Sequence, residues 1–227
     1  MRIAKMDKIR NNLMKHSSIG GANMRYFKSY YLFIVITLLL TGCVGVETEK
    51  SPSNSKLTIE SYNMSEKETL LISKTGVEQI KFFKLNGTLK EDDDLQFSVE
   101  VFENGKFKEE LLKTWDELET KYNDSLISFG IIDNRDEDHS LKLLNGIPSG
   151  LAATFYSNNM TTSSFGLLID RKMTLEKNKP IYLTAWLGTT KNELRSGGGT
   201  TGELPQGIEE AELAFIYKVL WTDKEKK

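Results

Sequence analysis

The stretch Leu95-Gln96-Phe97-Ser98-Val99-Glu100-Val101 decides the fold class expected for this 227-residue chain. Apolar residues occupy every second position, with Gln, Ser and Glu between them. This period of two is typical of a β-strand with one buried face and one solvated face. Asn104 and Gly105 follow shortly afterwards, and because both tolerate a positive φ they favour a hairpin turn. We therefore expect an antiparallel sheet in which the chain turns back at this pair.

Short apolar runs separated by turn residues continue this pattern along the chain. The run at 212–221 is apolar on both faces, which predicts a central strand. Further strands are predicted at 57–62, 70–73, 79–85, 126–132, 141–144, 151–156, 165–169 and 181–187. Many short strands of this kind predict a mainly β protein. The expected architecture is an antiparallel β-sandwich, of which the Ig-like sandwich is one form.

One segment departs from the strand pattern. Its apolar residues recur at steps of four, four, three and four, at Phe107, Leu111, Trp115, Leu118 and Tyr122. That spacing is typical of an amphipathic helix, whereas the turn before it favours a returning strand. We expect a short return strand from 106 and one short helix over about 109–122.

A long apolar run near the N-terminus determines where the protein is expected to reside. Residues 24–28 supply a basic flank, 30–40 an apolar centre, and Thr41-Gly42 a junction of small residues. These are the three parts of an export signal, in the expected order. The alternative is an uncleaved anchor, because residues 29–46 are uncharged and approach the length of about 17 to 25 residues that spans a bilayer.

The residues that end this run, Leu40-Thr41-Gly42-Cys43, resemble the lipobox of bacterial lipoproteins. That family has a Leu at minus three and a small residue at minus one before an obligatory Cys. The resemblance, which covers 24–43, implies cleavage after Gly42 and a diacylglycerol group on the thiol of Cys43. Two acyl chains suffice for stable attachment to a membrane. The expected localisation is therefore lipid-anchored, on the extracytoplasmic face of the cell membrane.

The chain divides into four parts on this interpretation. Residues 1–23 are an upstream extension or reflect a mis-assigned start, with Met24 as the alternative start. Residues 24–42 form the signal peptide, and 43–56 carry the lipidated Cys and a Ser- and Pro-containing tether. Residues 57–227 form a single β-sandwich domain. Cys43 is the only cysteine, so the domain can contain no internal disulfide.

The charge of the mature chain limits its partners. The first 42 residues hold seven Lys or Arg and one acid, which leaves 23 basic and 31 acidic residues and a net charge of −8. Nucleic acids and anionic lipid surfaces select clustered positive charge, so neither is expected as a partner. The expected partners are the membrane, through Cys43, and an envelope protein or glycan.

Two segments are candidate contact sites. The acidic turn at 133–139 offers Asp133, Asp136 and Asp138 as weak calcium ligands, although the EF-hand pattern fails there and a solvated turn is favoured. The Gly-rich loop at 191–207 is the preferred site for a ligand or partner. Its candidate contact residues are Arg195, Gly197, Gly198, Gly199 and Thr200. The P-loop pattern fails because Glu203 and Leu204 follow the last glycine.

Catalytic motifs are few in the mature sequence. His139 is its single histidine, and no nucleophile elbow or HExxH motif occurs. We expect no cofactor, and a binding or interaction module of the cell envelope. The alternative is a carboxylate-based hydrolase acting on envelope glycans. The late-strand aromatics, expected in the core or else in an exposed binding platform, are Tyr182, Trp186, Tyr217 and Trp221.

Overall fold

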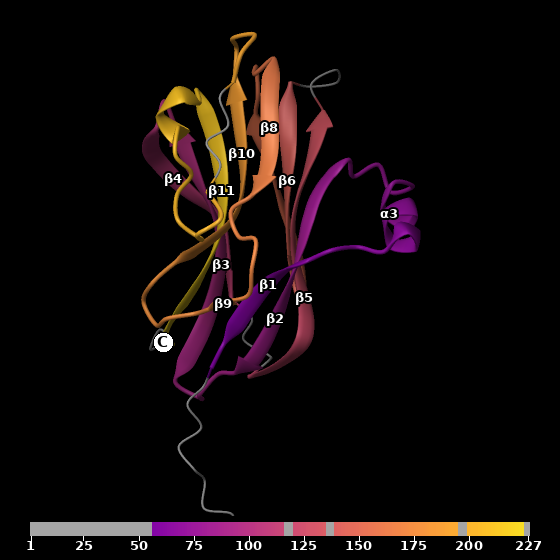
Figure 1. Ribbon diagram of the computed structural model, residues 1–227. Helices are drawn as coiled ribbons and strands as arrows, with labels where there is room; N and C mark the ends of the chain where they lie inside the picture. Colours follow the sequence, from indigo (N-terminus) through magenta and orange to yellow (C-terminus); the bar gives the residue numbers. More distant parts are fainter. Residues whose placement is uncertain (1–55, 116–119, 135–138, 195–198, 225–227) are drawn as a thin grey trace, which may run out of the picture. The chain divides into compact units, whose positions relative to one another are not determined.

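The computed structural model describes residues 56–115, 120–134, 139–194 and 199–224. Two antiparallel sheets face each other in these residues, which confirms the predicted mainly β sandwich (Figure 1). The export signal, Cys43 and the tether to residue 55 lie outside the described residues. No described helix is long and apolar enough to cross a membrane.

Sheet A has the strand order β7-β6-β5-β2-β1-β9. Its strands are β1 (Thr58–Tyr62), β2 (Gln79–Thr88), β5 (Lys121–Asn134), β6 (Ser140–Ile147), β7 (Gly150–Ser157) and β9 (Met173–Thr174). Sheet B has the order β4-β3-β11-β10-β8. Its strands are β3 (Asp93–Glu103), β4 (Lys106–Trp115), β8 (Thr162–Leu167), β10 (Ile181–Thr189) and β11 (Leu213–Asp223). Two short helices are described, α3 (Glu66–Ile72) and the 3-10 turn η1 (Ile208–Glu210).

The core lies between the two sheets and follows the alternation seen in the sequence. The alternate apolar residues of the stretch at 95–101 are fully buried, and their neighbour β11 is a central strand, as predicted. The predicted solvated face of this stretch is wrong, because Gln96 and Ser98 are buried on the outer face of sheet B. Tyr217 of β11 stacks on Phe129 of sheet A, with ring centroids 5.2 Å apart. Its hydroxyl donates a hydrogen bond of 3.0 Å to the buried side chain of Asn145 on β6. The two sheets are therefore joined by a polar link inside the apolar core.

A second, smaller apolar cluster covers part of the outer face of sheet B. It contains Phe102, Leu168, Ala185, Leu187, Ala211, Ala214 and Ile216. Leu194 and Ile208, from the segment between β10 and β11, pack against it. These two residues therefore cover part of the outer face of sheet B, which explains why β11 is apolar on both faces.

The predicted helix over 109–122 is wrong in the residues that the structure describes there, 109–115 and 120–122. Residues up to Trp115 continue β4, and β5 begins at Lys121. The pairing of β4 with β3 shifts register twice, and Leu112 has a positive φ of 49°. Residues four apart also lie on one face of a regular strand, so apolar steps of four do not by themselves distinguish a strand from a helix. The two bulges add residues to β4 and shift part of it from one face to the other. The Asn104-Gly105 hairpin, with φ values of 49° and 72°, is confirmed.

The predicted strand at 70–73 is also wrong, because these residues belong to α3 and its C-cap. Ser65 caps the helix: its hydroxyl accepts from the backbone N–H of Glu68, whose carboxylate accepts from the backbone N–H of Ser65. This reciprocal pair is a capping box, which stabilises the start of a helix. The described helix therefore lies between β1 and β2 and not between β4 and β5.

Candidate functional site

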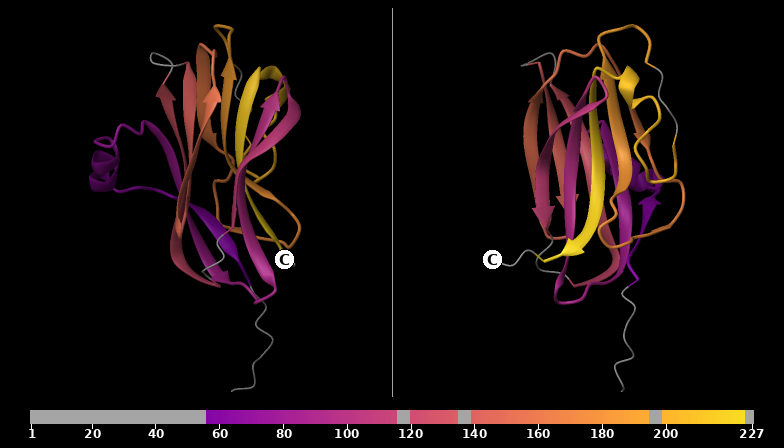
Figure 2. Two further views of the ribbon diagram at one scale, coloured as in Figure 1. Left: turned by 180° about the vertical axis from the view of Figure 1, so that it is seen from behind. Right: turned by 90° about the vertical axis from the view of Figure 1, so that its left-hand side faces the viewer.

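Helix α3 stands off the side of sheet A that faces away from sheet B (Figure 1 and the left view of Figure 2). None of its residues is buried, and Leu70 and Leu71 are 59% and 60% exposed. Helices of globular proteins normally bury an apolar stripe against the core. This helix instead presents its leucines to the solvent.

A tyrosine at the end of β1 connects the helix to the sheet. Tyr62 Oη donates a hydrogen bond of 2.7 Å to Glu68 Oε1. Hydrogen bonds from Ser65 and Tyr62 lower the pKa of Glu68 to about 2, so its carboxylate stays charged and keeps both contacts. The Nζ atom of Lys84 lies 4.9 Å from the centroid of the Tyr62 ring. The position of α3 beside the sheet is therefore set by polar contacts at its first turn.

An apolar cavity of about 180 Å³ opens between α3 and the outer face of sheet A. Its lining is mostly apolar and comes from both elements: Tyr62, Met64, Glu68, Leu71, Ile72, Phe82 and Leu126. Ligand sites in proteins are usually concave and mainly apolar, with few polar groups. The cavity has this character, with the Glu68 carboxylate as its charged group.

The outer face of sheet A leads from this cavity to exposed apolar side chains on β7. The register aligns the outer-face residues Phe82, Ser128, Gly146 and Leu151 in one row across four strands. Leu126, Leu151 and Phe155 are exposed, the last two by 67% and 58%. We call α3 and the outer-face residues of sheet A the outer apolar face. Exposed large apolar side chains gathered on one face of a protein indicate a candidate interaction site.

The acidic turn is only partly described. Asp133 lies at the end of β5 and lines a polar pocket of about 630 Å³ with Glu78, His139 and Asn158. Asp136 and Asp138 lie outside the described residues. Among the described residues, no group of three or more His, Cys, Asp or Glu side chains is placed to hold a metal ion.

The Gly-rich loop is attached to sheet B in its described part. Gly202 donates a backbone hydrogen bond to Leu168 and accepts one from Tyr182, and Thr201 forms a bridge with Ile169. Of the predicted contact residues, Gly199 is half-buried and Thr200 is exposed. Arg195, Gly197 and Gly198 lie outside the described residues.

The start of this loop lines a second polar pocket, of about 660 Å³, at the end of sheet B. Four glutamates line it with Lys191 and two asparagines: Glu193, Glu209, Glu210 and Glu212. The hydroxyls of Thr189 and Thr190 donate hydrogen bonds to Glu212 and lower its pKa. A general acid needs a raised pKa, so Glu212 is instead stabilised as an anion that holds the loop.

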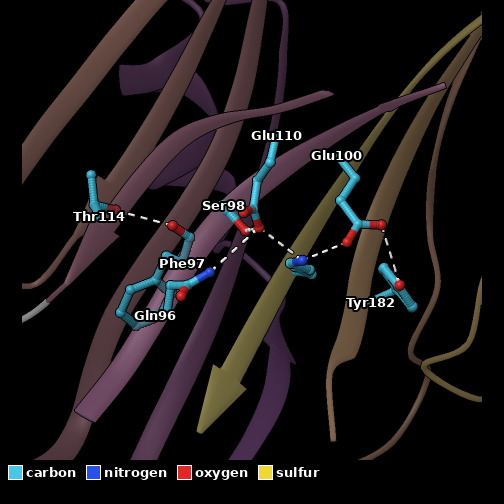
Figure 3. A network of polar contacts seen from close by, with 8 residues as sticks. Gln96, Phe97, Ser98, Glu100, Glu110, Thr114 and Tyr182 are labelled. Atoms are coloured by element: carbon cyan, nitrogen blue, oxygen red, sulfur yellow. Dashed lines mark hydrogen bonds and ion pairs between the residues drawn. The ribbon is translucent and has the colours of Figure 1, made fainter. Parts of the chain in front are cut away.

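The outer face of sheet B carries a network of partly buried charges (Figure 3). Lys218 donates hydrogen bonds to Glu110, at 2.8 Å, and to Glu100. Ser98 Oγ donates to Glu110 at 2.7 Å, and Tyr182 Oη donates to Glu100 at 3.2 Å. Burial raises the pKa of Glu110, but the hydrogen bonds and charge of Lys218 outweigh it and leave that pKa lowered. Each charge in this network has a partner, which is typical of structural ion pairs.

The late-strand aromatics lie mostly in the core, as predicted. Trp186 and Tyr217 are fully buried, and Trp221 packs against the main cluster. Tyr182 lies on the outer face of sheet B, where it packs against the second cluster. Together they form no exposed aromatic platform.

Comparison with protein families identifies the domain. A family model for the YgaN domain matches residues 58–220, which is more than half of the chain. The chain belongs to the YgaN domain family. The match begins at the first residue of β1 and ends within β11, so the YgaN domain includes both sheets, α3 and the outer apolar face. No curated protein and no solved structure matches the chain significantly.

The outer apolar face was missed in the sequence because residues 70–73 were interpreted as a strand. The signal that identifies α3 is Ser65, followed three residues later by Glu68 and then by Leu70-Leu71-Ile72. A Ser with Glu three positions later, before an apolar run, is the capping-box pattern. Exposure of the leucines, by contrast, is a property of the folded chain that no local pattern indicates.

Proposed function

We propose that this protein is a lipid-anchored binding module on the extracytoplasmic face of the cell membrane, and that the outer apolar face binds another component of the envelope. One observation carries the binding role. A capped helix that buries none of its residues lies beside an apolar cavity on a sheet with exposed Leu and Phe side chains. Exposing apolar side chains in this way favours association with a partner.

The location rests on the lipobox-like residues Leu40 to Cys43 and on the tether that follows them. The Ser- and Pro-containing composition of 44–56 is typical of linkers, and a flexible linker of thirteen residues has a root-mean-square length of roughly 20 Å, at about 5 to 6 Å times the square root of the residue number. A domain on this tether remains close to the membrane but can reorient. Such mobility suits a module that contacts neighbouring envelope components.

The anchor is tested with the variant Cys43→Ala. We expect the precursor to remain unprocessed and to take up no labelled palmitate, because the variant lacks the thiol that receives the lipid. Gly42→Asp, which places a bulky charge before the cleavage point, should block processing in the same way. Normal maturation of the Cys43→Ala protein would exclude the lipid anchor.

The binding surface is tested by photo-crosslinking in the cells that make the protein. A photo-reactive amino acid replaces Leu71 in one variant and Phe107 in a matched control, because Phe107 is similarly exposed but lies on β4 of sheet B. We expect a discrete adduct with another envelope component from position 71 and none from position 107. No adduct at position 71, or the same adducts at both positions, would contradict the proposed surface.

A further inference from the structure

The edge strands of the two sheets differ in how well they are protected from pairing with another strand. An exposed sheet edge carries unpaired N–H and C=O groups, and proteins protect it with charges, prolines, bulges or short length. β4 carries lysines and glutamates and two register shifts, and β9 has two residues. β8 is short and exposes no large apolar side chain. β7, with the sequence GLAATFYS, has eight residues, no charge, no proline and no bulge.

The free backbone groups of β7 belong to the residues whose side chains are exposed. Asn158 N–H, directly after β7, donates to the carbonyl of His139, directly before β6. Since backbone bonding alternates along an antiparallel strand, the even-numbered residues of β7 bond to β6. The N–H and C=O groups that point away from β6 therefore belong to Leu151, Ala153 and Phe155. These same residues are exposed on the outer face of sheet A.

We propose that β7 pairs antiparallel with β7 of a second copy of this chain, about a two-fold axis at Ala153, and so joins two A sheets into one. This inference goes beyond the proposed function and does not depend on it. The sequence of β7 is self-complementary in that register: Ala153 lies opposite Ala153, and Leu151 opposite Phe155. Each such pair exchanges two backbone hydrogen bonds, and aromatic with aliphatic pairs are favourable across strands.

The charges near β7 are compatible with this pairing. Lys142 of β6 lies beside Phe155, with its Nζ atom 5.6 Å from the ring centroid. In the paired sheet, the row that contains Lys142 and Phe155 continues into Leu151 and Gly146 of the partner copy. Each Lys142 therefore faces apolar residues of the other copy, and no like charges are placed opposite each other. A net charge of −8 on the mature chain makes two copies repel each other. β7 carries no charge, so this repulsion is weakest along its edge.

The mass in solution provides the first test. The full-length Cys43→Ser chain takes no lipid but keeps its apolar segment at 30–40. Its mass is therefore measured by analytical ultracentrifugation in a mild non-ionic detergent that covers this segment, at about 100 µM, where an interface of micromolar affinity is populated. We expect a dimer of the 25.8 kDa chain. A monomer at this concentration, or an open series of larger assemblies, would overturn the proposal.

Two variants test whether β7 carries the association. Ala153→Pro removes an N–H that the proposal assigns to the partner and that no bond within the sheet uses, and proline is tolerated at such positions of edge strands. Phe155→Lys adds the charge that protects natural edges. Both should remain folded by circular dichroism and become monomeric. Leu70→Lys, equally exposed but on α3, should stay dimeric. A dimer that survives both β7 variants, or that Leu70→Lys abolishes, would overturn the proposal.

A single cysteine tests the register. Opposed residues of a hydrogen-bonded pair have Cα atoms about 5.5 Å apart, within the range of about 4.4 to 6.8 Å that disulfides span. In the Cys43→Ser chain, Ala153→Cys should form a disulfide-linked dimer on mild oxidation. Thr154→Cys, whose half-buried side chain points to the other face, should not. Crosslinking at position 154 but not at 153 would exclude the two-fold register proposed here.

Discussion

Gly105 occupies a turn in which both the backbone conformation and the neighbouring chain exclude a side chain. Its φ is 72°, and a Cβ atom there would lie 2.6 Å from the Cα of Glu209 in η1. The hairpin tip between β3 and β4 is thus packed against the segment that leads into β11. Asn104 reinforces this contact, because its N–H donates to the carbonyl of Glu212.

Gly105→Ala should therefore lower the free energy of unfolding by more than the cost of a left-handed backbone at a non-glycine residue. That cost is about 1 to 2 kcal/mol. The added methyl group also forces Glu209 away and strains the start of β11. Chemical denaturation of the variant measures this loss. Asn104→Gly is the matched control, because Gly also adopts positive φ, and its stability should change by less than about 1 kcal/mol. Equal stability of Gly105→Ala and the parent would contradict the tight contact.

At the scale of elements, α3 and β4 show how a local pattern is decided by its context. The apolar spacing of β4 is typical of a helix but also fits a strand, and the hairpin at 104–105 decides between them by placing the segment beside β3. α3 is the opposite case: it forms through its own capping box and buries nothing. Local interactions are therefore its main source of stability.

Ser65→Ala should consequently unfold α3 locally and leave the melting temperature of the domain nearly unchanged. Loss of an N-cap costs about 1 kcal/mol, or about a fivefold change in the opening equilibrium. Hydrogen exchange at the amide of Thr69, which bonds to the Ser65 carbonyl, should accelerate by about that factor. Lys67→Ala, on the exposed side of the helix, should not accelerate it. A large fall in melting temperature for Ser65→Ala would show that α3 supports the core after all.

At the scale of the whole molecule, the charge network on sheet B couples stability to pH. The pKa of Glu110 is lowered, so its contribution is complete above its unfolded value of about 4.3 and is lost as the pH falls through the folded value. Burial lowers the pKa of Lys218, but its two glutamates outweigh this and leave it raised. The contribution of Lys218 is therefore present below about pH 10.4 and is lost at higher pH, as the pH passes its folded value.

Glu110→Gln isolates the acid limb of this dependence. The variant should melt at a lower temperature than the parent at pH 7, because Lys218 loses one of its two anionic partners. Below about pH 4 the difference in melting temperature should shrink, because Glu110 of the parent becomes protonated and is then neutral, like the Gln of the variant. Melting curves from pH 3 to 8 measure it. A difference that is the same at every pH would mean that the charge of Glu110 contributes nothing.

The sequence by itself determined the fold class and the strands with strict alternation, because the face of a strand that lines the apolar core recurs at every second residue. It determined the hairpin at 104–105 through two residues that accept positive φ. Tertiary structure alone decided that α3 stands away from the core, that Leu194 and Ile208 pack over sheet B, and that β7 forms an edge. These features depend on which strands become neighbours in the sheets and on which residues pack against each surface. Such long-range relations leave no periodic signal in a single sequence.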